Sequence, residues 1–130
     1  MQKQLKLDPK IDTPKIDFNS ETGDLYIEGK SFPPDVNEFY DEILIWIDLF
    51  INSLPSKTNI HLKLEYFNTS SSKILMDILY KFEDLQKNSG NVTIYWYYPE
   101  DDEDMKETGK EYSELINIPF KQIGYKFFLD

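Results

Sequence analysis

Hydrophobic residues recur along the chain with two different periods, and the period changes at clear boundaries. Apolar and polar residues alternate over residues 15–18 and 24–28, on either side of a turn-rich segment, which predicts a β-hairpin. From residue 36 to 54 the apolar positions are spaced by three and four residues, which is the period of an amphipathic helix. Pro55 then ends this predicted helix.

The same two periods alternate through the second half of the chain. Residues 60–66 predict a strand that buries Ile60, Leu62, Leu64 and Tyr66 on one face. Apolar positions from 74 to 85 predict a second helix that ends at Gly90, and residues 92–98 predict another strand. A weaker helical pattern over 105–116 and a last extended segment ending at Phe128 complete the chain.

The resulting element order, ββαβαβαβ, is typical of an α/β fold. Strands that are separated by helices are expected to run parallel with right-handed crossovers, whereas the opening hairpin is antiparallel. We therefore expect a mixed β-sheet with most helices packed on one face. Residues 1–14 lack any periodicity and predict an extended N-terminal tail, and residues 15–130 form a single domain.

Composition narrows the range of partners. The 130 residues suffice for one hydrophobic core, and 40% of them are apolar. The 24 acidic and 14 basic side chains give a net charge of -10, which argues against binding to nucleic acid or to an anionic membrane surface. The sequence has no membrane-spanning apolar run and no signal peptide, so we expect a cytoplasmic protein. The absence of cysteine excludes disulfides, thiolate nucleophiles and cysteine zinc sites.

The most informative segment is the junction between the strand at 60–66 and the following helix, residues 68–72. It holds five small polar side chains, Asn68, Thr69, Ser70, Ser71 and Ser72. Backbone amides at the start of a helix have no internal partner, and the helix dipole is positive there, so a phosphorylated hydroxyl is tolerated at this position. The residues alone favour a purely structural interpretation, an N-cap and a tight turn.

Other chemistry-bearing residues have simpler interpretations. His61, the single histidine, lies in an alternating strand and is expected to be a solvent-facing or sheet-covering side chain, not a base or a metal ligand. The acidic run 100–104 lacks the ligand spacing of an EF-hand and is interpreted as a solvated helix start. Aromatic residues 95–98 are assigned to the core and the sheet face. We identify no catalytic motif, so we expect a non-enzymatic protein without a metal or cofactor.

The element order resembles the STAS fold of anti-sigma-factor antagonists, and the chain more closely resembles the SiaC-type regulatory phosphoproteins. The resemblance extends over nearly the whole chain. It is carried by Tyr66-Phe67-Asn68-Thr69-Ser70-Ser71 with Lys73, by Met76-Asp77-Ile78, Thr13-Pro14 and Gly29-Lys30-Ser31-Phe32-Pro33, and by Trp46-Ile47, Phe50, Trp96 and Tyr98. The chain departs from the family pattern at Phe67, where leucine is usual, and at Ser72, where an aliphatic residue is usual.

The resemblance implies a phosphorylation switch. It implies that Thr69 is phosphorylated by a kinase of the anti-sigma-factor-kinase type and dephosphorylated by a PPM-type phosphatase. It also implies that the unphosphorylated protein activates a diguanylate cyclase, in c-di-GMP signalling and biofilm control. Ser70, Ser71 and Ser72 are less favoured acceptors. We expect a partner to contact Asn68, Thr69, Ser70, Ser71, Lys73 and Asp77, of which Lys73 lies one helical turn after Thr69.

Two alternatives to this function stay open from the sequence. The chain is also compatible with a small ligand-binding protein or enzyme that uses a pocket on the exposed sheet face, near His61 and the tyrosines. A structural scaffold, in which the junction is only a cap, is the third possibility.

Overall fold

The computed structural model describes residues 2–126, which form six strands and three helices. In chain order the elements are β1 (Gln4–Leu7), β2 (Lys15–Asn19), β3 (Asp24–Ser31), α1 (Val36–Asn52), β4 (Thr58–Phe67), α2 (Thr69–Ser89), β5 (Val92–Pro99), α3 (Glu103–Leu115) and β6 (Phe120–Tyr125). All six strands belong to one sheet, and their order in the sheet is the same as their order in the chain.

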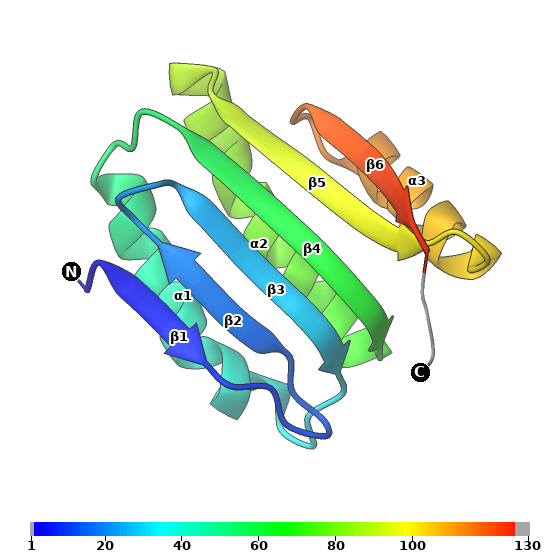
Figure 1. Ribbon diagram of the computed structural model, residues 1–130. Coiled ribbons are helices and arrows are strands. Elements are labelled where there is room, and N and C mark those ends of the chain that lie inside the picture. Colours follow the sequence, from blue (N-terminus) through cyan, green and yellow to red (C-terminus); the bar gives the residue numbers. More distant parts are fainter. Residues whose placement is uncertain (1, 127–130) are drawn as a thin grey trace.

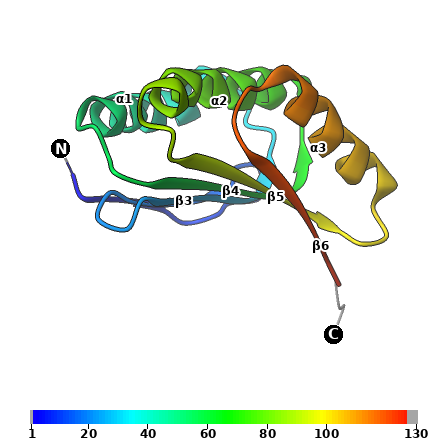
Figure 2. The ribbon, with the colours of Figure 1, turned by 90° about the horizontal axis from the view of Figure 1, so that it is seen from above.

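The sheet is mixed, as predicted. β1, β2 and β3 pair antiparallel, whereas β3, β4, β5 and β6 pair parallel. The three helices cover one face of the sheet and leave the other face open (Figures 1 and 2). The predicted α/β architecture with helices on one face is therefore confirmed.

The hydrophobic core fills the layer between the sheet and the helices. Its largest fully buried side chains come from both layers and are Trp96, Tyr40, Phe18, Phe50 and Phe82. Burial of a side chain of this size contributes about 1.5–3 kcal/mol to folding, so α1 and α2 are held mainly by their apolar faces. The predicted helical stripes in these two segments are confirmed.

The predicted N-terminal tail contains a strand that the periodicity did not reveal. β1 pairs with β2, Leu5 is buried opposite Phe18, and the indole N–H of Trp46 donates to the Gln2 carbonyl oxygen at 3.0 Å. The correct order is therefore βββαβαβαβ. The four residues of β1 are too few to show a period, and their burial depends on pairing with the edge of β2.

The alternation in β4 breaks near its end. Leu64 is buried, but Tyr66 is half exposed and Phe67 turns toward the core, where it packs edge-on against Trp96. The cause is a register shift between β3 and β4, because Gly29 pairs with Leu64 whereas Lys30 pairs with Tyr66. One extra residue in β4 reverses the faces of all later side chains, so the predicted burial of Tyr66 is wrong.

Two predicted boundaries also change. α1 ends at Asn52, and Leu54 lies outside it with a φ of 53° and an exposed side chain. The predicted final extended segment corresponds to β6, while its last two residues, Phe127 and Phe128, lie outside the described range.

Candidate functional site

The junction lies at the edge of the sheet where the parallel strands β3 and β4 end. Ser31, the last residue of β3, pairs with Phe67, the last residue of β4. The Asn68 amide then donates to the Ser31 carbonyl oxygen at 3.0 Å, which fixes the chain at the point where α2 begins. Ligand and partner sites of α/β sheets commonly lie at this edge.

Asn68 is the N-cap of α2. Its side-chain oxygen accepts from the Ser71 amide at 2.9 Å, and its carbonyl oxygen accepts from the Ser72 amide at 2.9 Å. Within residues 2–126 the amides of Thr69 and Ser70 have no such partner, as is usual for the first two residues of a helix. The predicted cap is confirmed, and two free donors remain beside the first two hydroxyls of the junction.

The structure divides the predicted site residues into two groups. Thr69, Ser70, Lys73 and Asp77 have exposed side chains. Thr69, Lys73 and Asp77 are spaced by four residues, so they follow one another along a single face of α2. The junction therefore presents two hydroxyls, one cation and one carboxylate to solvent.

Ser71 belongs to the second group, because its side chain is fully buried. Its Oγ lies 2.7 Å from Ser31 Oγ, which in turn lies 2.7 Å from the Tyr40 hydroxyl. Burial raises the pKa of Tyr40 to about 12, although its hydrogen bond with Ser31 acts in the opposite direction. Ser71 thus has a structural role in this fold, and its hydroxyl is not accessible to a partner.

Ser72 is also engaged inside the fold. Its Oγ lies 2.6 Å from the hydroxyl of Tyr112 in α3, and that hydroxyl donates to the Ser72 carbonyl oxygen at 3.1 Å. Burial raises the pKa of Tyr112, with the Ser72 hydrogen bond opposing the shift. Both tyrosine hydroxyls are therefore protonated at physiological pH.

An exposed aromatic pair beside the junction was missed by the sequence reasoning. Phe32 is 37% exposed and Tyr66 is 51% exposed, and their rings meet edge to face with centroids 5.8 Å apart. Both residues lie at the same sheet edge as Asn68, which binds Ser31 directly before Phe32. The available signal was their position at strand ends, but the β4 register shift that exposes Tyr66 is not visible in the sequence.

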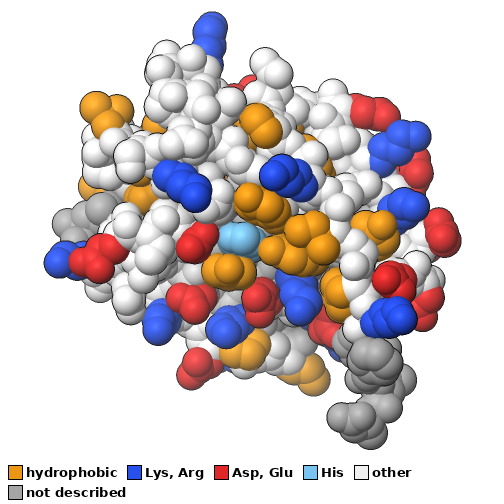
Figure 3. Space-filling model, turned by 45° about the horizontal axis from the view of Figure 1, so that its top comes forward, with side chains coloured by type: hydrophobic (Ala, Val, Ile, Leu, Met, Phe, Trp, Pro, Cys, Tyr) orange, Lys and Arg blue, Asp and Glu red, His pale blue; other side chains and the backbone are white. Residues whose placement is uncertain are grey.

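The open sheet face carries a cross-strand ladder centred on His61. The imidazole stacks between Tyr26 and Tyr95, with ring centroids 4.1 and 4.8 Å away and nearly parallel planes, and it is only 8% exposed. Its Nδ1 lies 2.9 Å from the Tyr97 hydroxyl. In Figure 3 the histidine lies among hydrophobic side chains on this face. Both faces of the imidazole are covered by tyrosine rings, so the predicted sheet-covering role of His61 is confirmed.

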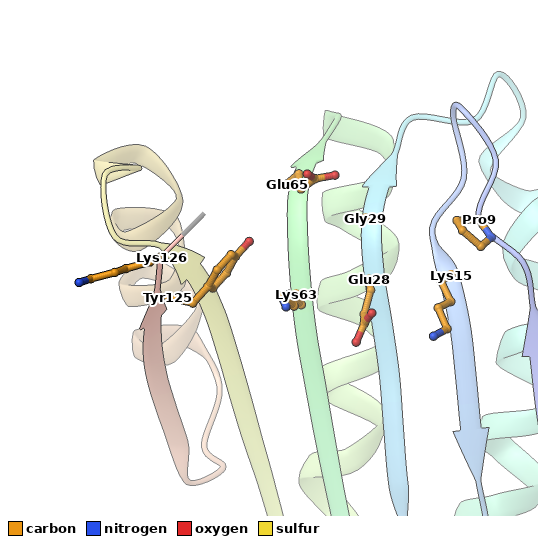
Figure 4. Close-up of a pocket in the computed structure, with 8 residues that line it drawn as sticks. All are labelled: Pro9, Lys15, Glu28, Gly29, Lys63, Glu65, Tyr125 and Lys126. Atoms are coloured by element: carbon orange, nitrogen blue, oxygen red, sulfur yellow. The ribbon is translucent and has the colours of Figure 1, made fainter. Parts of the chain in front are cut away.

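A groove on the same face is the site that the enzyme or ligand-binding alternative would use. It has a volume of about 470 Å³ and is lined by Pro9, Lys15, Glu28, Gly29, Lys63, Glu65, Tyr125 and Lys126 (Figure 4). Lysines and glutamates alternate across it, and the Lys63 ammonium lies 4.7 Å from the centre of the Tyr125 ring. Burial, followed by nearby carboxylates, raises the pKa of Tyr125, which makes it a poor base or nucleophile.

The acidic run forms the start of α3, as predicted. Asp102 is the N-cap, and its side chain accepts from the Met105 amide at 3.0 Å. Across residues 2–126 no group of three or more histidine, aspartate or glutamate side chains is placed to hold a metal ion. In the same range, no helix combines the length and apolar character that a bilayer span requires.

Comparison with known proteins adds an independent line of evidence. A family model described as SiaC family regulatory phosphoprotein matches residues 7–125. An uncharacterized protein of Pseudomonas aeruginosa strain UCBPP-PA14 is 31% identical over 108 residues, which is 83% of this chain and 86% of that protein.

Solved structures show the same architecture. The SiaC chain in the crystal structure of the diguanylate cyclase SiaD with its activator SiaC, from Pseudomonas aeruginosa, is similar with a TM-score of 0.88 and 28% identity. That similarity covers 93% of this chain and 99% of the other. Apo-SiaC from the same organism gives a TM-score of 0.85 at 28% identity, over 94% of this chain and 99% of the other.

Proposed function

Because this chain belongs to the SiaC family of regulatory phosphoproteins, we propose that it is a non-enzymatic switch whose reversible phosphorylation at Thr69 controls binding to a partner protein. The observation that carries the proposal is the position of Thr69. It is exposed, it is the first residue of α2, and the amides of Thr69 and Ser70 are free beside it. Ser70 is the alternative acceptor, since Ser71 and Ser72 are engaged in internal hydrogen bonds.

The fold accommodates the modification without rearrangement. A phosphate adds about 1.5–2 negative charges and three strong acceptors. The positive end of the α2 dipole and the two free amides lie beside Thr69, which supports the proposal. Lys73, one turn further along the same face, adds about 0.3–0.5 kcal/mol of attraction. The conformation of the protein therefore survives phosphorylation, and its surface changes.

The regulated partner is a diguanylate cyclase. In the related complex, SiaC is the activator of the cyclase SiaD, and its chain resembles this one over 93% of the length. We extend that role to this chain: the unphosphorylated form binds and activates a cyclase through Asn68, Thr69, Ser70, Lys73 and Asp77. A kinase of the anti-sigma-factor-kinase type and a PPM-type phosphatase reset the switch.

Electrostatics explains why phosphorylation releases the partner. A partner that buries the neutral hydroxyls of the junction would have to desolvate a phosphate dianion after modification, which costs several kcal/mol if no cation compensates for it. A loss of about 2.7 kcal/mol already lowers affinity roughly a hundredfold. Asp77 opposes the added charge and is a candidate for direct contact with the partner.

Mass spectrometry of the modified protein tests this proposal. The wild-type protein is incubated with ATP and the anti-sigma-factor-type kinase from the same organism, in parallel with Thr69→Ala and Ser70→Ala variants. We expect one added phosphate in wild type and in Ser70→Ala, and none in Thr69→Ala. Phosphate on Thr69→Ala at the wild-type level would refute Thr69 as the acceptor.

A further inference from the structure

We propose that Tyr40 and Tyr112 are positioning residues that select the phosphate acceptor. Tyr40 acts through Ser31 to hold the Ser71 hydroxyl inside the fold, and Tyr112 holds the Ser72 hydroxyl directly, so that a kinase meets only the hydroxyls of Thr69 and Ser70. The inference rests on the proposed switch, but it assigns roles to two distant tyrosines that neither the junction sequence nor the family comparison identifies.

The first anchor is a chain of three buried hydroxyls. Ser31, Tyr40 and Ser71 are each fully buried, and both oxygen-to-oxygen distances along the chain are 2.7 Å. Burying a hydroxyl away from water costs free energy unless it forms a hydrogen bond, so the three hydroxyls stabilise one another in the buried position. The chain links the first turn of α2 to the end of β3 and to the helix α1.

The second anchor holds both the side chain and the backbone of Ser72. The Tyr112 hydroxyl lies 2.6 Å from Ser72 Oγ and donates to the Ser72 carbonyl oxygen at 3.1 Å. The Tyr112 ring packs against Trp96, with centroids 4.9 Å apart, and against Phe67 at 6.2 Å. Because the ring is confined between these aromatic residues, the hydroxyl stays directed at Ser72.

These anchors separate neighbouring hydroxyls that are chemically alike. Phosphoryl transfer requires the acceptor oxygen to form a bond to the γ-phosphorus of ATP while the bond from that phosphorus to ADP breaks, and the hydroxyl proton passes to a base of the kinase. An oxygen that is buried against Ser31 or bound to Tyr112 is unable to make this approach. Thr69 and Ser70 are free of both anchors and remain exposed.

A matched set of variants isolates the two hydroxyls. Tyr40→Phe and Tyr112→Phe each remove one oxygen and keep the ring that fills the core. Tyr80→Phe is the control, because Tyr80 lies on α2, is 44% exposed and has no hydrogen bond to the junction in the described structure. Thermal unfolding of the three variants verifies that each one is folded.

Hydrogen exchange tests the anchors without any kinase. Loss of one hydrogen bond corresponds to about a fivefold change in a local opening equilibrium. We therefore expect the amides of residues 71–74 to exchange about fivefold faster in Tyr40→Phe and in Tyr112→Phe, and at the wild-type rate in Tyr80→Phe. Unchanged exchange in both anchor variants would overturn the proposal.

Localisation of phosphate by tandem mass spectrometry tests acceptor selection directly. After treatment with the kinase and ATP, we expect wild type and Tyr80→Phe to carry phosphate on Thr69 or Ser70 alone, and Tyr112→Phe to carry phosphate on Ser72 as well. Phosphate on Ser71 or Ser72 of wild type, or the same distribution in all variants, would refute the selection. Absence of any phosphate on wild type would refute the proposed function, while the exchange measurement would still decide on the anchors.

Discussion

At the scale of single residues, the four hydroxyls of the junction differ only through their distant neighbours. Ser71 and Ser72 look like Ser70 in the sequence, but their partners Ser31 and Tyr112 each lie 40 residues away along the chain. Local propensity identified the cap at Asn68 and the helix start. It gave no signal for which hydroxyls are buried, because that depends on tertiary contacts.

The Asn68 cap provides a first prediction. Replacement by alanine removes the acceptor for the Ser71 amide, so we expect Asn68→Ala to lower the free energy of unfolding by about 1 kcal/mol. Urea denaturation measures the change. Asn68→Asp retains an acceptor and adds a charge that favours the helix dipole, so it should match or exceed wild type. Equal losses in both variants would contradict the assigned capping bond.

Tyr40 predicts a dependence of stability on alkaline pH. Burial raises its pKa from 10.0 to about 12, so above pH 10 the unfolded chain releases this proton before the folded chain does. Stability should therefore fall as pH rises from 10 to 12, by an amount on the order of 2–3 kcal/mol from this group. Urea denaturation of wild type and Tyr40→Phe at pH 9 and pH 11.5 measures the difference. Equal pH slopes would contradict the burial of the neutral Tyr40 hydroxyl.

At the scale of elements, the periodicity predicted every helix and five of the six described strands. β1 escaped because Leu5 and Leu7 provide only two apolar positions, and their burial depends on pairing with β2. The register shift at Gly29 and Lys30 escaped because it is a property of two strands, whereas periodicity is read from one. The shift turns Tyr66 outward beside Phe32 and packs Phe67 against Tyr112.

The packing of α3 on the sheet depends on Gly109. A Cβ atom at this position would lie 2.6 Å from both Cδ1 and Nε1 of the buried Trp96 indole. Alanine gains about 1 kcal/mol in helix propensity, but the clash with a rigid ring outweighs this gain. We expect Gly109→Ala to destabilise the protein by about 1–2 kcal/mol in urea denaturation, whereas Lys110→Ala, at an exposed position of α3, should have little effect. A Gly109→Ala variant more stable than wild type would contradict close packing of α3 against the Trp96 ring.

At the scale of the whole molecule, the exposed groups of the junction lie at one end of the sheet, where β3 and β4 finish. The ends of β3 and β4 and the start of α2 come together there (Figure 1). The aromatic pair of Phe32 and Tyr66 lies at the same ends of these strands. The fold class followed from the sequence because alternating strands and helices admit few arrangements. The set of residues that meet at this edge could not be predicted from the sequence, because they come from segments that are far apart along the chain.

The aromatic pair predicts an apolar contribution to partner binding. Exposed aromatic residues near the centre of an interface commonly dominate its energy. We expect Tyr66→Ala and Phe32→Ala each to weaken cyclase binding about tenfold, corresponding to about 1.4 kcal/mol. Tyr80→Ala is the control, because it removes an exposed tyrosine from α2 at a distance from this pair along the chain. Isothermal titration calorimetry measures the dissociation constant for the cyclase. Wild-type values for all three variants would contradict a role of the aromatic pair in binding.

We propose that a single phosphate on Thr69 releases the partner. The affinity of the cyclase for the phosphorylated and unphosphorylated forms of this protein tests this directly. Calorimetric titration of the cyclase with unmodified and with Thr69-phosphorylated protein should give dissociation constants that differ by about a hundredfold or more, with the unmodified form tighter. Thr69→Ala treated with the kinase and ATP should bind like the unmodified form. Equal affinities for the modified and unmodified protein would contradict the account.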